Sequence, residues 1–432
     1  MFCQLEILRH CFPSSVLQIL EELPEGLDET YERILREIRK PNQGHAHRLL
    51  QCLVVAARPL RVEELAEILT VDFKAEGIPK QNPAWRWEDQ EAAVLSACSS
   101  LVIIVEDGAS RITQFSHFSV KEFLTADRLA DPTRDVSRFH IRLETAHTIL
   151  AQACLGVLLR LDDRVDRDNI KVFPLVLYAA QYWPTHARFE SGASRIKEGI
   201  ECLFDSDKPH FATWLWIYNE ERQYRSMSTM CPEKPGAVPL YYAAMLGFRG
   251  LAEHLIAKHP EHVNAKGGNY KTPMQIAAIA GHADILSLLL EHGADVEDGA
   301  KAWTPLHRAS WKGNLEAGQC LLDHGAVINA RTALGETPLF RAVYQEHVEF
   351  ARMLLNNKHG ASINVLDDNL GWTPLHAAVY KRNSQAVRLL LEHGADVNAR
   401  SKYGETPSQL GSQKRFREMV ELLSEYGAES AK

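Results

Sequence analysis

A four-residue phrase returns through the second half of this 432-residue chain. It reads Thr304-Pro305-Leu306-His307 and again Thr373-Pro374-Leu375-His376. Looser copies begin at four further positions, namely Val238, Thr272, Thr337 and Thr406. The prolines of successive copies stand 34, 32, 33, 36 and 33 residues apart. A period of about 33 residues restricts this half to a stack of similar units, because each unit can cover its apolar face only with a neighbour.

The phrase predicts how each unit folds. Thr304 is a good N-cap, and Pro305 falls at the first helical position, where its missing N–H costs nothing. Gly313 breaks this inner helix, an outer helix follows, and Gly325 supplies a left-handed stop. The same stop is expected at Gly293, Gly360, Gly394 and Gly427. The phrase and its period resemble the ankyrin repeat, which implies that His307 is structural and bonds to the cap and a neighbouring loop.

About six such repeats occupy residues 234–432. The end copies are atypical, because Val238 replaces the capping threonine and Gly411-Ser412 replaces small apolar residues. Repeat four carries three extra residues, which we place in loops around 356–358 and 367–368. The aspartate pairs at 162–163 and 367–368 are expected to be solvated.

The first half lacks this period and predicts separate helices and one hairpin. Helical spacing predicts an amphipathic helix pair over 16–39, broken at Pro24. Further helices are expected over 47–57, 62–69, 89–99, 118–129, 143–161, 171–183, 194–204 and 210–218. Strands are expected over 101–105 and 111–115, joined by the turn at 106–108. Three helices followed by a hairpin is the order of a winged-helix domain, and Trp183, Trp214 and Trp216 are predicted to pack in a core.

Three segments carry a second resemblance. The stretches at 23–35, 57–65 and 115–124 (LPEGLDETYERIL, ARPLRVEEL and FSHFSVKEFL) resemble the region that follows the nucleotide-binding domain of fungal NACHT–ankyrin proteins, which are NOD-like, or STAND, signalling ATPases. The resemblance implies a sensor built on the repeats. However, the phosphate-binding motif G-x-x-x-x-G-K-[ST] is absent from the sequence, so we expect a C-terminal part without the ATPase domain.

The fold expected is therefore mainly α, in four parts. Residues 1–40 are a remnant of the segment after a NACHT domain, 41–130 a winged-helix-like domain, 131–233 a helical linker domain, and 234–432 the ankyrin solenoid. A net charge of −8 argues against nucleic acid or an anionic membrane as the partner. The eight scattered cysteines form no C-x-x-C pair, and no apolar run could span a membrane. These features favour a cytoplasmic protein, with the nucleus as the alternative.

Positions that vary between repeats indicate a protein-binding surface. The residue before the capping threonine and the two before the inter-helix break are expected on the concave face. In repeats three to five these positions hold Trp303, Trp311, Lys312, Tyr344, Gln345, Trp372, Tyr380 and Lys381. Tryptophan and tyrosine are favoured interface anchors. The competing interpretation is that some of these rings pack on neighbouring loops of the array.

Other candidate sites have weaker support. The family resemblance implies a contact between His117 and a nucleotide phosphate, but the missing phosphate loop favours a helix-start histidine satisfied internally. The segment 61–67 could enter DNA only against the repulsion of its three glutamates. The histidines of the repeats follow the repeat period and not a metal-ligand spacing. We therefore predict no metal, no cofactor and no enzyme activity.

Three functions remain open. The first is the sensor or adaptor part of a fungal NOD-like protein, which binds a protein ligand and docks on a full-length NACHT-family protein. The second is a free-standing ankyrin regulator that masks a partner, whose effect should survive deletion of residues 1–233. The third is a nucleotide-dependent switch that acts with a partner chain, which ATP binding by the purified protein would support.

Overall fold

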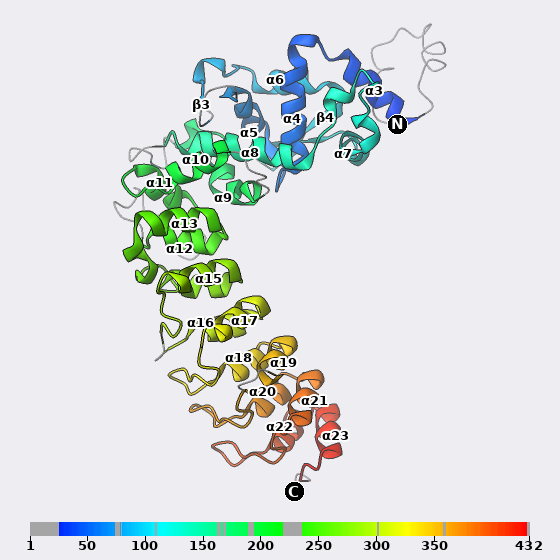
Figure 1. The fold of residues 1–432 in the computed structure, drawn as a ribbon. Coiled ribbons are helices and arrows are strands. Elements are labelled where there is room, and N and C mark those ends of the chain that lie inside the picture. Colours follow the sequence, from blue (N-terminus) through cyan, green and yellow to red (C-terminus); the bar gives the residue numbers. More distant parts are fainter. Residues whose placement is uncertain are drawn as a thin grey trace. The chain divides into compact units, whose positions relative to one another are not determined.

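The structure is a computed structural model, and it describes residues 26–73, 78, 80–108, 110–161, 166, 170–188, 194–218, 236–299, 302–356 and 360–429. The chain forms two compact units, Met1–Pro235 and Gly236–Lys432 (Figure 1). The helix expected before Pro24, the pair Asp162-Asp163, and Asn357 and Lys358 of repeat four lie outside the described residues.

The first unit begins with helices and a small sheet. The helices are α3 (Leu27–Glu37), α4 (Gln43–Val55), α5 (Val62–Glu67) and α6 (Gln90–Cys98), and the strands β4 (Val102–Asp107) and β5 (Ser110–Phe115) follow. The predicted hairpin is confirmed, with a turn at Gly108. A third strand, β1 (Leu60–Arg61), pairs antiparallel with β5 and completes the order β1-β5-β4. The Thr113 hydroxyl donates to the Leu60 carbonyl over 2.9 Å.

Several short elements were not predicted. The strands β2 (Val71–Asp72) and β3 (Lys80–Gln81) form a second antiparallel pair. Two-residue strands show no alternation of apolar and polar residues, so periodicity could not find them or β1. Single 3-10 turns connect the elements of the chain: η2 (Lys40–Asn42), η3 (Ile68–Thr70), η4 (Pro83–Trp85), η5 (Ser99–Leu101), η7 (Ser137–Phe139), η8 (Ile170–Val172) and η10 (Pro260–Asn264).

Two predicted helices are interrupted. The helix expected over 118–129 ends as α7 (Phe118–Thr125), because Ala126 is extended and a 3-10 turn, η6 (Asp127–Ala130), follows. The helix expected over 171–183 begins later, as α9 (Val176–Ala187), and only the turn η8 precedes it. Pro174 lies between them, and the residue before a proline is disfavoured in a helix.

The remaining helices of this unit build a second apolar core. They are α8 (Leu143–Leu158), α9, α10 (Ser194–Leu203) and α11 (Pro209–Ile217), and α8 packs against α4, α9 and α10. Trp183, Trp214 and Trp216 are buried, as predicted. The rings of Trp183 and Trp214 meet edge to face at 5.8 Å, and the Trp214 indole N–H donates to the Ala180 carbonyl over 3.0 Å. The N–H groups of buried indoles need such partners.

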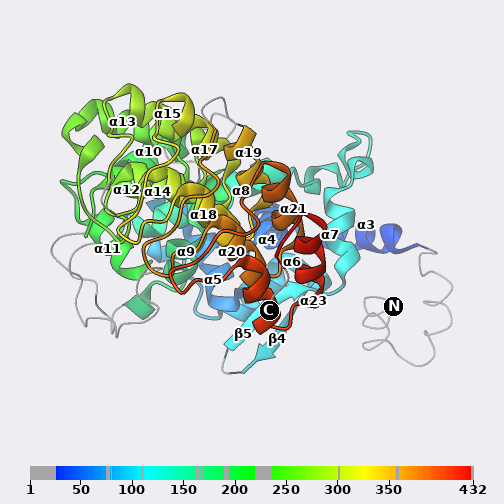
Figure 2. The ribbon, with the colours of Figure 1, turned by 90° about the horizontal axis from the view of Figure 1, so that it is seen from below.

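The second unit contains six helix pairs in its described part, one for each copy of the phrase. The inner helices are α12 (Pro239–Leu246), α14 (Pro273–Ala280), α16 (Pro305–Lys312), α18 (Pro338–Tyr344), α20 (Pro374–Tyr380) and α22 (Pro407–Gln413). The outer helices are α13 (Arg249–Lys258), α15 (Ala283–Glu291), α17 (Leu315–Asp323), α19 (Val348–Asn356), α21 (Ser384–Glu392) and α23 (Arg417–Glu425). Inner and outer helices form two rows, and long loops extend on the side of the inner row (Figure 1). Figure 2 shows the same two rows from below.

The caps follow the sequence pattern. The threonine hydroxyls at 272, 304, 337, 373 and 406 accept from the backbone N–H of the third helical residue, whereas Val238 makes no such bond. His307 Nδ1 lies 2.8 Å from the Thr304 hydroxyl, and His376 makes the matching contact with Thr373 at 2.9 Å. The predicted structural role of these histidines is therefore confirmed.

The turns between an inner and an outer helix at Gly247, Gly281 and Gly313 are filled by a side chain of the next repeat, namely His282, Asn314 and His347. Gly313 has φ +72°, and a Cβ added there would lie 2.6 Å from His347 Nδ1. The His347 ring contacts the Trp311 carbonyl through Nε2 at 3.1 Å, and so satisfies a carbonyl at the end of the preceding inner helix. In repeats four to six the position of Gly313 is taken by Glu346, Arg382 and Arg415, which retain positive φ values of 65°, 53° and 60°.

Candidate functional site

The predicted binding residues of repeat three form a cluster of rings and cations. Trp303 and Trp311 are half-buried and meet edge to face, with ring centroids 6.0 Å apart. The Arg308 and Arg341 guanidinium carbons lie 4.8 and 4.5 Å from the Trp303 centroid, and the exposed Lys312 Nζ lies 4.5 Å from that of Trp311. Such contacts stabilise a ring and a cation by about 0.5–1 kcal/mol at exposed sites. We call these five residues the repeat-three cluster.

The predicted residues of repeats four and five form another group. Tyr380 is 39% exposed, stacks on Tyr344 at 6.4 Å and contacts Trp372 at 5.1 Å. Lys381 lies over Tyr344 at 4.7 Å, and Lys414 of repeat six lies over Tyr380 at 5.5 Å. We call these residues the repeat-five cluster. The rings therefore pack on one another and keep part of their faces accessible, and protein binding at these positions stays a prediction.

The sequence prediction missed three of the five cations in these two clusters. Arg308, Arg341 and Lys414 were not among the candidates, yet each lies over a predicted ring. Arg308 and Arg341 occupy the same position of the inner helix, one residue after the recurring phrase, and this shared position is the signal that could have found them. Burial lowers the pKa of the Arg308 guanidinium, and the nearby Tyr270 and Tyr241 offset part of this fall. Gln345, also predicted, is half-buried and ends α18.

A buried aspartate holds the loop that carries Trp372. The carboxylate of Asp367 accepts from the backbone N–H groups of Asn369 at 3.1 Å, Leu370 at 3.0 Å and Trp372. The expectation that the pair at 367–368 is solvated is therefore wrong for Asp367, whose oxygens satisfy loop donors that would otherwise be unpaired. Asp368 remains exposed and pairs with Arg331 over 2.8 Å.

His117 acts as the N-cap of α7. Its Nδ1 accepts from the Ser119 backbone N–H over 3.3 Å and lies 2.6 Å from the Ser119 hydroxyl. That hydroxyl lies 2.8 Å from the Tyr31 hydroxyl on α3. The imidazole is exposed and already engaged within the domain, as the internally satisfied interpretation predicts.

The segment considered for DNA differs from expectation. Two of its three glutamates, Glu64 and Glu67, are buried and turned inward. Glu64 pairs with Arg58 over 2.7 Å, and Glu67 accepts from Arg86 Nε over 2.9 Å. The predicted repulsion of phosphate therefore rests on fewer charges than the three glutamates of the sequence, since buried, paired carboxylates contribute little to the outer potential. These carboxylates anchor the domain instead.

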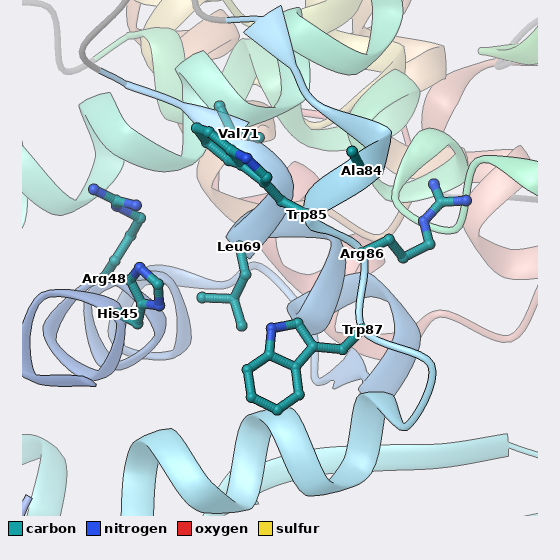
Figure 3. Close-up of a pocket in the computed structure, with 8 residues that line it drawn as sticks. All are labelled: His45, Arg48, Leu69, Val71, Ala84, Trp85, Arg86 and Trp87. Atoms are coloured by element: carbon teal, nitrogen blue, oxygen red, sulfur yellow. The ribbon is translucent and has the colours of Figure 1, made fainter. Parts of the chain in front are cut away.

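An open pocket of about 580 Å³ lies in the winged-helix region. Figure 3 shows His45 and Arg48 on α4 at one wall, Leu69 in the middle, and Trp85 and Trp87 on opposite sides of Leu69. Arg86 points away from the two indoles. Trp85 and Trp87 follow Pro83 closely in the sequence, and two tryptophans in a short loop could have indicated a binding site. The sequence prediction did not consider them.

The described histidines outside the recurring phrase show two arrangements. His292, His324 and His393 each place Nδ1 at 2.8–2.9 Å from the carbonyl four residues earlier, as structural residues do. His259, Glu261 and His262, where repeat one ends without a glycine, bring possible metal-ligand atoms within 4.8 Å of one another. Glu261 already lies 3.3 Å from His259 Nδ1.

The described cysteines at 52, 98, 154, 202 and 320 are free, and no described helix is long and apolar enough to cross a membrane.

Family models match both units of the chain. Residues 240–332 and 359–431 match ankyrin repeats (3 copies), and residues 334–368 match an ankyrin repeat. Residues 31–136 match the winged helix domain of GPI inositol-deacylase. The chain contains C-terminal ankyrin repeats and an N-terminal winged-helix domain. The predicted fold class is thereby confirmed.

Individual relatives cover parts of this chain. Azaphilone pigments biosynthesis cluster protein L of Monascus ruber is 34% identical over 296 residues, which is 64% of this chain, and this chain spans 61% of its length. Ankyrin repeat and SAM domain-containing protein 6 of Mus musculus is 35% identical over 100 residues, 23% of this chain and 11% of its own length. The solved ankyrin repeat domain of Bcl-3, a member of the IkappaB family, is 28% identical, with a TM-score of 0.42, over 46% of this chain and 89% of its own.

Proposed function

We propose that this chain is a non-catalytic interaction protein that binds a protein partner on the concave face of repeats three to five. One observation carries the proposal: the variable positions of three successive repeats gather aromatic rings, and Trp303, Trp311, Tyr344 and Tyr380 each have a cation over the ring face. Packing of the repeats themselves does not require tryptophan at 303 and 311. Partly exposed aromatic anchors beside positive charges are typical of protein-binding surfaces.

The charges favour a partner segment with carboxylates next to apolar side chains. Lys312 and Lys414 are exposed and make no ion pair with any carboxylate of the described residues, and Lys381 is 3.9 Å from Glu346 at its nearest. A bound acidic segment would give these ammonium groups partners, while its apolar side chains cover the rings of Tyr380 and Trp311. Complementary charge of this kind raises the association rate and selects against basic partners.

In this proposal the chain is a sensor or adaptor, and its winged-helix and helical part transmits the binding of the partner. The match of residues 31–136 to a winged-helix domain supports a structured arm and not a simple tail. The resemblance to fungal NACHT–ankyrin proteins suggests that this arm docks on a full-length family member. The 34% identity to a Monascus ruber protein supports a fungal setting for the proposal.

Affinity capture from native extract with two matched variants tests the surface. Tyr380 and Tyr426 are 39% and 38% exposed, but Tyr426 ends an outer helix away from the repeat-five cluster. We expect Tyr380→Ala with Lys312→Glu and Lys414→Glu to lose a partner that the wild type and Tyr426→Ala both retain. One anchor contributes about 2 kcal/mol, which is roughly 30-fold in affinity. Equal capture by all three chains, each shown to be folded by circular dichroism, would contradict the proposal.

A further inference from the structure

The pocket of the winged-helix domain has an apolar floor and two aromatic sides. Leu69 and Val71 are buried, whereas the neighbouring Trp85 and Trp87 side chains are 47% and 53% exposed. The volume of about 580 Å³ falls within the range of small-molecule sites, roughly 300–1,000 Å³. Such sites combine mostly apolar walls with a few polar groups, and here the polar groups come from α4.

The segment that carries the two indoles is held in place from behind. Arg86, between them, donates from Nε to the buried carboxylate of Glu67 over 2.9 Å, and Gln81 Nε2 donates to the same carboxylate over 3.2 Å. The side chain of Asn82 accepts from the Ala84 backbone N–H over 3.1 Å. A ligand would therefore meet indoles on an anchored segment, and this lowers the entropy lost on binding.

The wall opposite the indoles carries the positive charge of Arg48, and the charge of Asp72 acts on this guanidinium without forming an ion pair with it. Arg48 is half-buried and stacks its guanidinium on Phe73 at 4.4 Å, but no carboxylate of the described residues forms an ion pair with it. Burial lowers its pKa, although arginine stays charged at neutral pH. Burial and the charge of Arg48 also lower the pKa of His45, so His45 contributes a neutral ring at pH 7. The guanidinium fork fits a carboxylate or a sulfonate.

We propose that this pocket binds a small organic anion with a flat apolar body. The body would lie against the indoles of Trp85 and Trp87 and over Leu69, and the anionic group would accept hydrogen bonds from Arg48. The described lining residues all belong to the first unit, so this proposal does not rest on the proposed partner surface. Binding of one such molecule would both bury the two indoles and neutralise the Arg48 guanidinium.

Two probes that share an N-phenylnaphthylamine frame test the site on the full chain. 8-Anilinonaphthalene-1-sulfonate carries a sulfonate, whereas N-phenyl-1-naphthylamine is neutral. In fluorescence titrations we expect Arg48→Met to weaken binding of the sulfonate probe about tenfold or more, and binding of the neutral probe less than about twofold. Trp85→Ala with Trp87→Ala should weaken both. Arg111→Met, which removes an exposed cation on the wing strand β5, is the matched control and should change neither.

A measurement on the wild type covers the case in which a variant fails to fold. Oxidative footprinting should show that the sulfonate probe protects Trp85 and Trp87 and leaves the other tryptophans unchanged. The proposal is overturned if these two indoles are not protected. It is also overturned if a folded Arg48→Met variant loses affinity for both probes equally, or for neither.

Discussion

His307 Nε2 lies 3.0 Å from the backbone carbonyl oxygen of Glu336, in the repeat that follows. The same ring binds its own capping threonine through Nδ1, so one imidazole joins two successive repeats. His376 repeats the arrangement with Glu405, also at 3.0 Å. Repeat two has a glutamine at this position, and Gln275 donates to the carbonyls of Asp298 and Trp303 over 2.9 Å.

The stability of repeat three should fall in acid through His307. Burial lowers its pKa to about 4, whereas the unfolded chain takes up a proton near the ordinary value of 6.5. The contribution of this residue is therefore complete above pH 6.5 and is lost as the pH falls towards 4. Between pH 7 and 5 the loss is about 2 kcal/mol. Hydrogen exchange of repeat-three peptides at the two pH values measures it.

His307→Gln is the matched variant, because the chain itself uses glutamine at this position in repeats two and six. Glutamine does not titrate, so we expect its acid-induced loss to be smaller by about 2 kcal/mol. An identical loss in wild type and variant would show that His307 does not carry the pH dependence.

Gly313→Ala should destabilise the second unit more than Gly394→Ala. Both glycines have positive φ, 72° and 86°, so alanine is strained at either site. Only at Gly313 would the new methyl group collide with the ring of His347, since the space around Gly394 is open. We expect a loss of about 1 kcal/mol at Gly394 and about 2–4 kcal/mol at Gly313 in urea unfolding. Equal losses would mean that the ring shifts at no cost.

Asp367→Asn should loosen the loop before Trp372. An amide offers one oxygen where the carboxylate now accepts from three backbone N–H groups, so at least one donor loses its partner. The expected cost is about 1–3 kcal/mol in the unfolding free energy. Asp368→Asn is the control, because its exposed pair with Arg331 contributes less than about 1 kcal/mol. Faster hydrogen exchange should appear at Leu370 and Trp372 only in the first variant.

Removing Glu67 should cost more than removing both partners of its ion pair. Glu67→Ala leaves Arg86, which is only partly exposed, and Gln81 without their acceptor, and we expect a loss of about 2–4 kcal/mol. In Glu67→Leu with Arg86→Met no charge remains unpaired, so the loss should be smaller. Thermal unfolding of these variants and of Glu91→Ala, at an exposed pair, measures the difference. A larger loss in the double variant would contradict this account.

The repeats could be predicted from the sequence because their signals are local. A threonine, a proline one residue later and a glycine after the outer helix each specify backbone geometry within a few residues, and the caps and the positive φ values confirm them. The winged-helix order could be predicted from the sequence as well, since α4, α5 and α6 precede the hairpin along the chain and the wing has a turn at Gly108.

What the sequence did not reveal depends on contacts between distant residues. Strand β1 exists through its pairing with β5, which lies more than 50 residues later. The inward direction of Glu64 and Glu67 follows from arginines before and after their helix. Asp367 becomes a loop anchor only because three backbone N–H groups converge on it. The ring–cation contacts of Trp303 join two repeats, so the variable positions of one repeat alone do not show them.

In the turn between an inner and an outer helix, a side chain of the next repeat covers the turn residue. This contact limits which segments of the array can be duplicated or exchanged. His347 fits the space that Gly313 leaves, and Phe416 lies under the guanidinium of Arg382 at 5.2 Å, where the chain has no glycine. A turn residue and the side chain that covers it belong to different repeats, so they must be inherited together. The two members of each pair, Gly313 with His347 and Arg382 with Phe416, stand 34 positions apart. Duplication or exchange of a single repeat of about 33 residues would therefore separate such a pair wherever the ends of the exchanged segment fall.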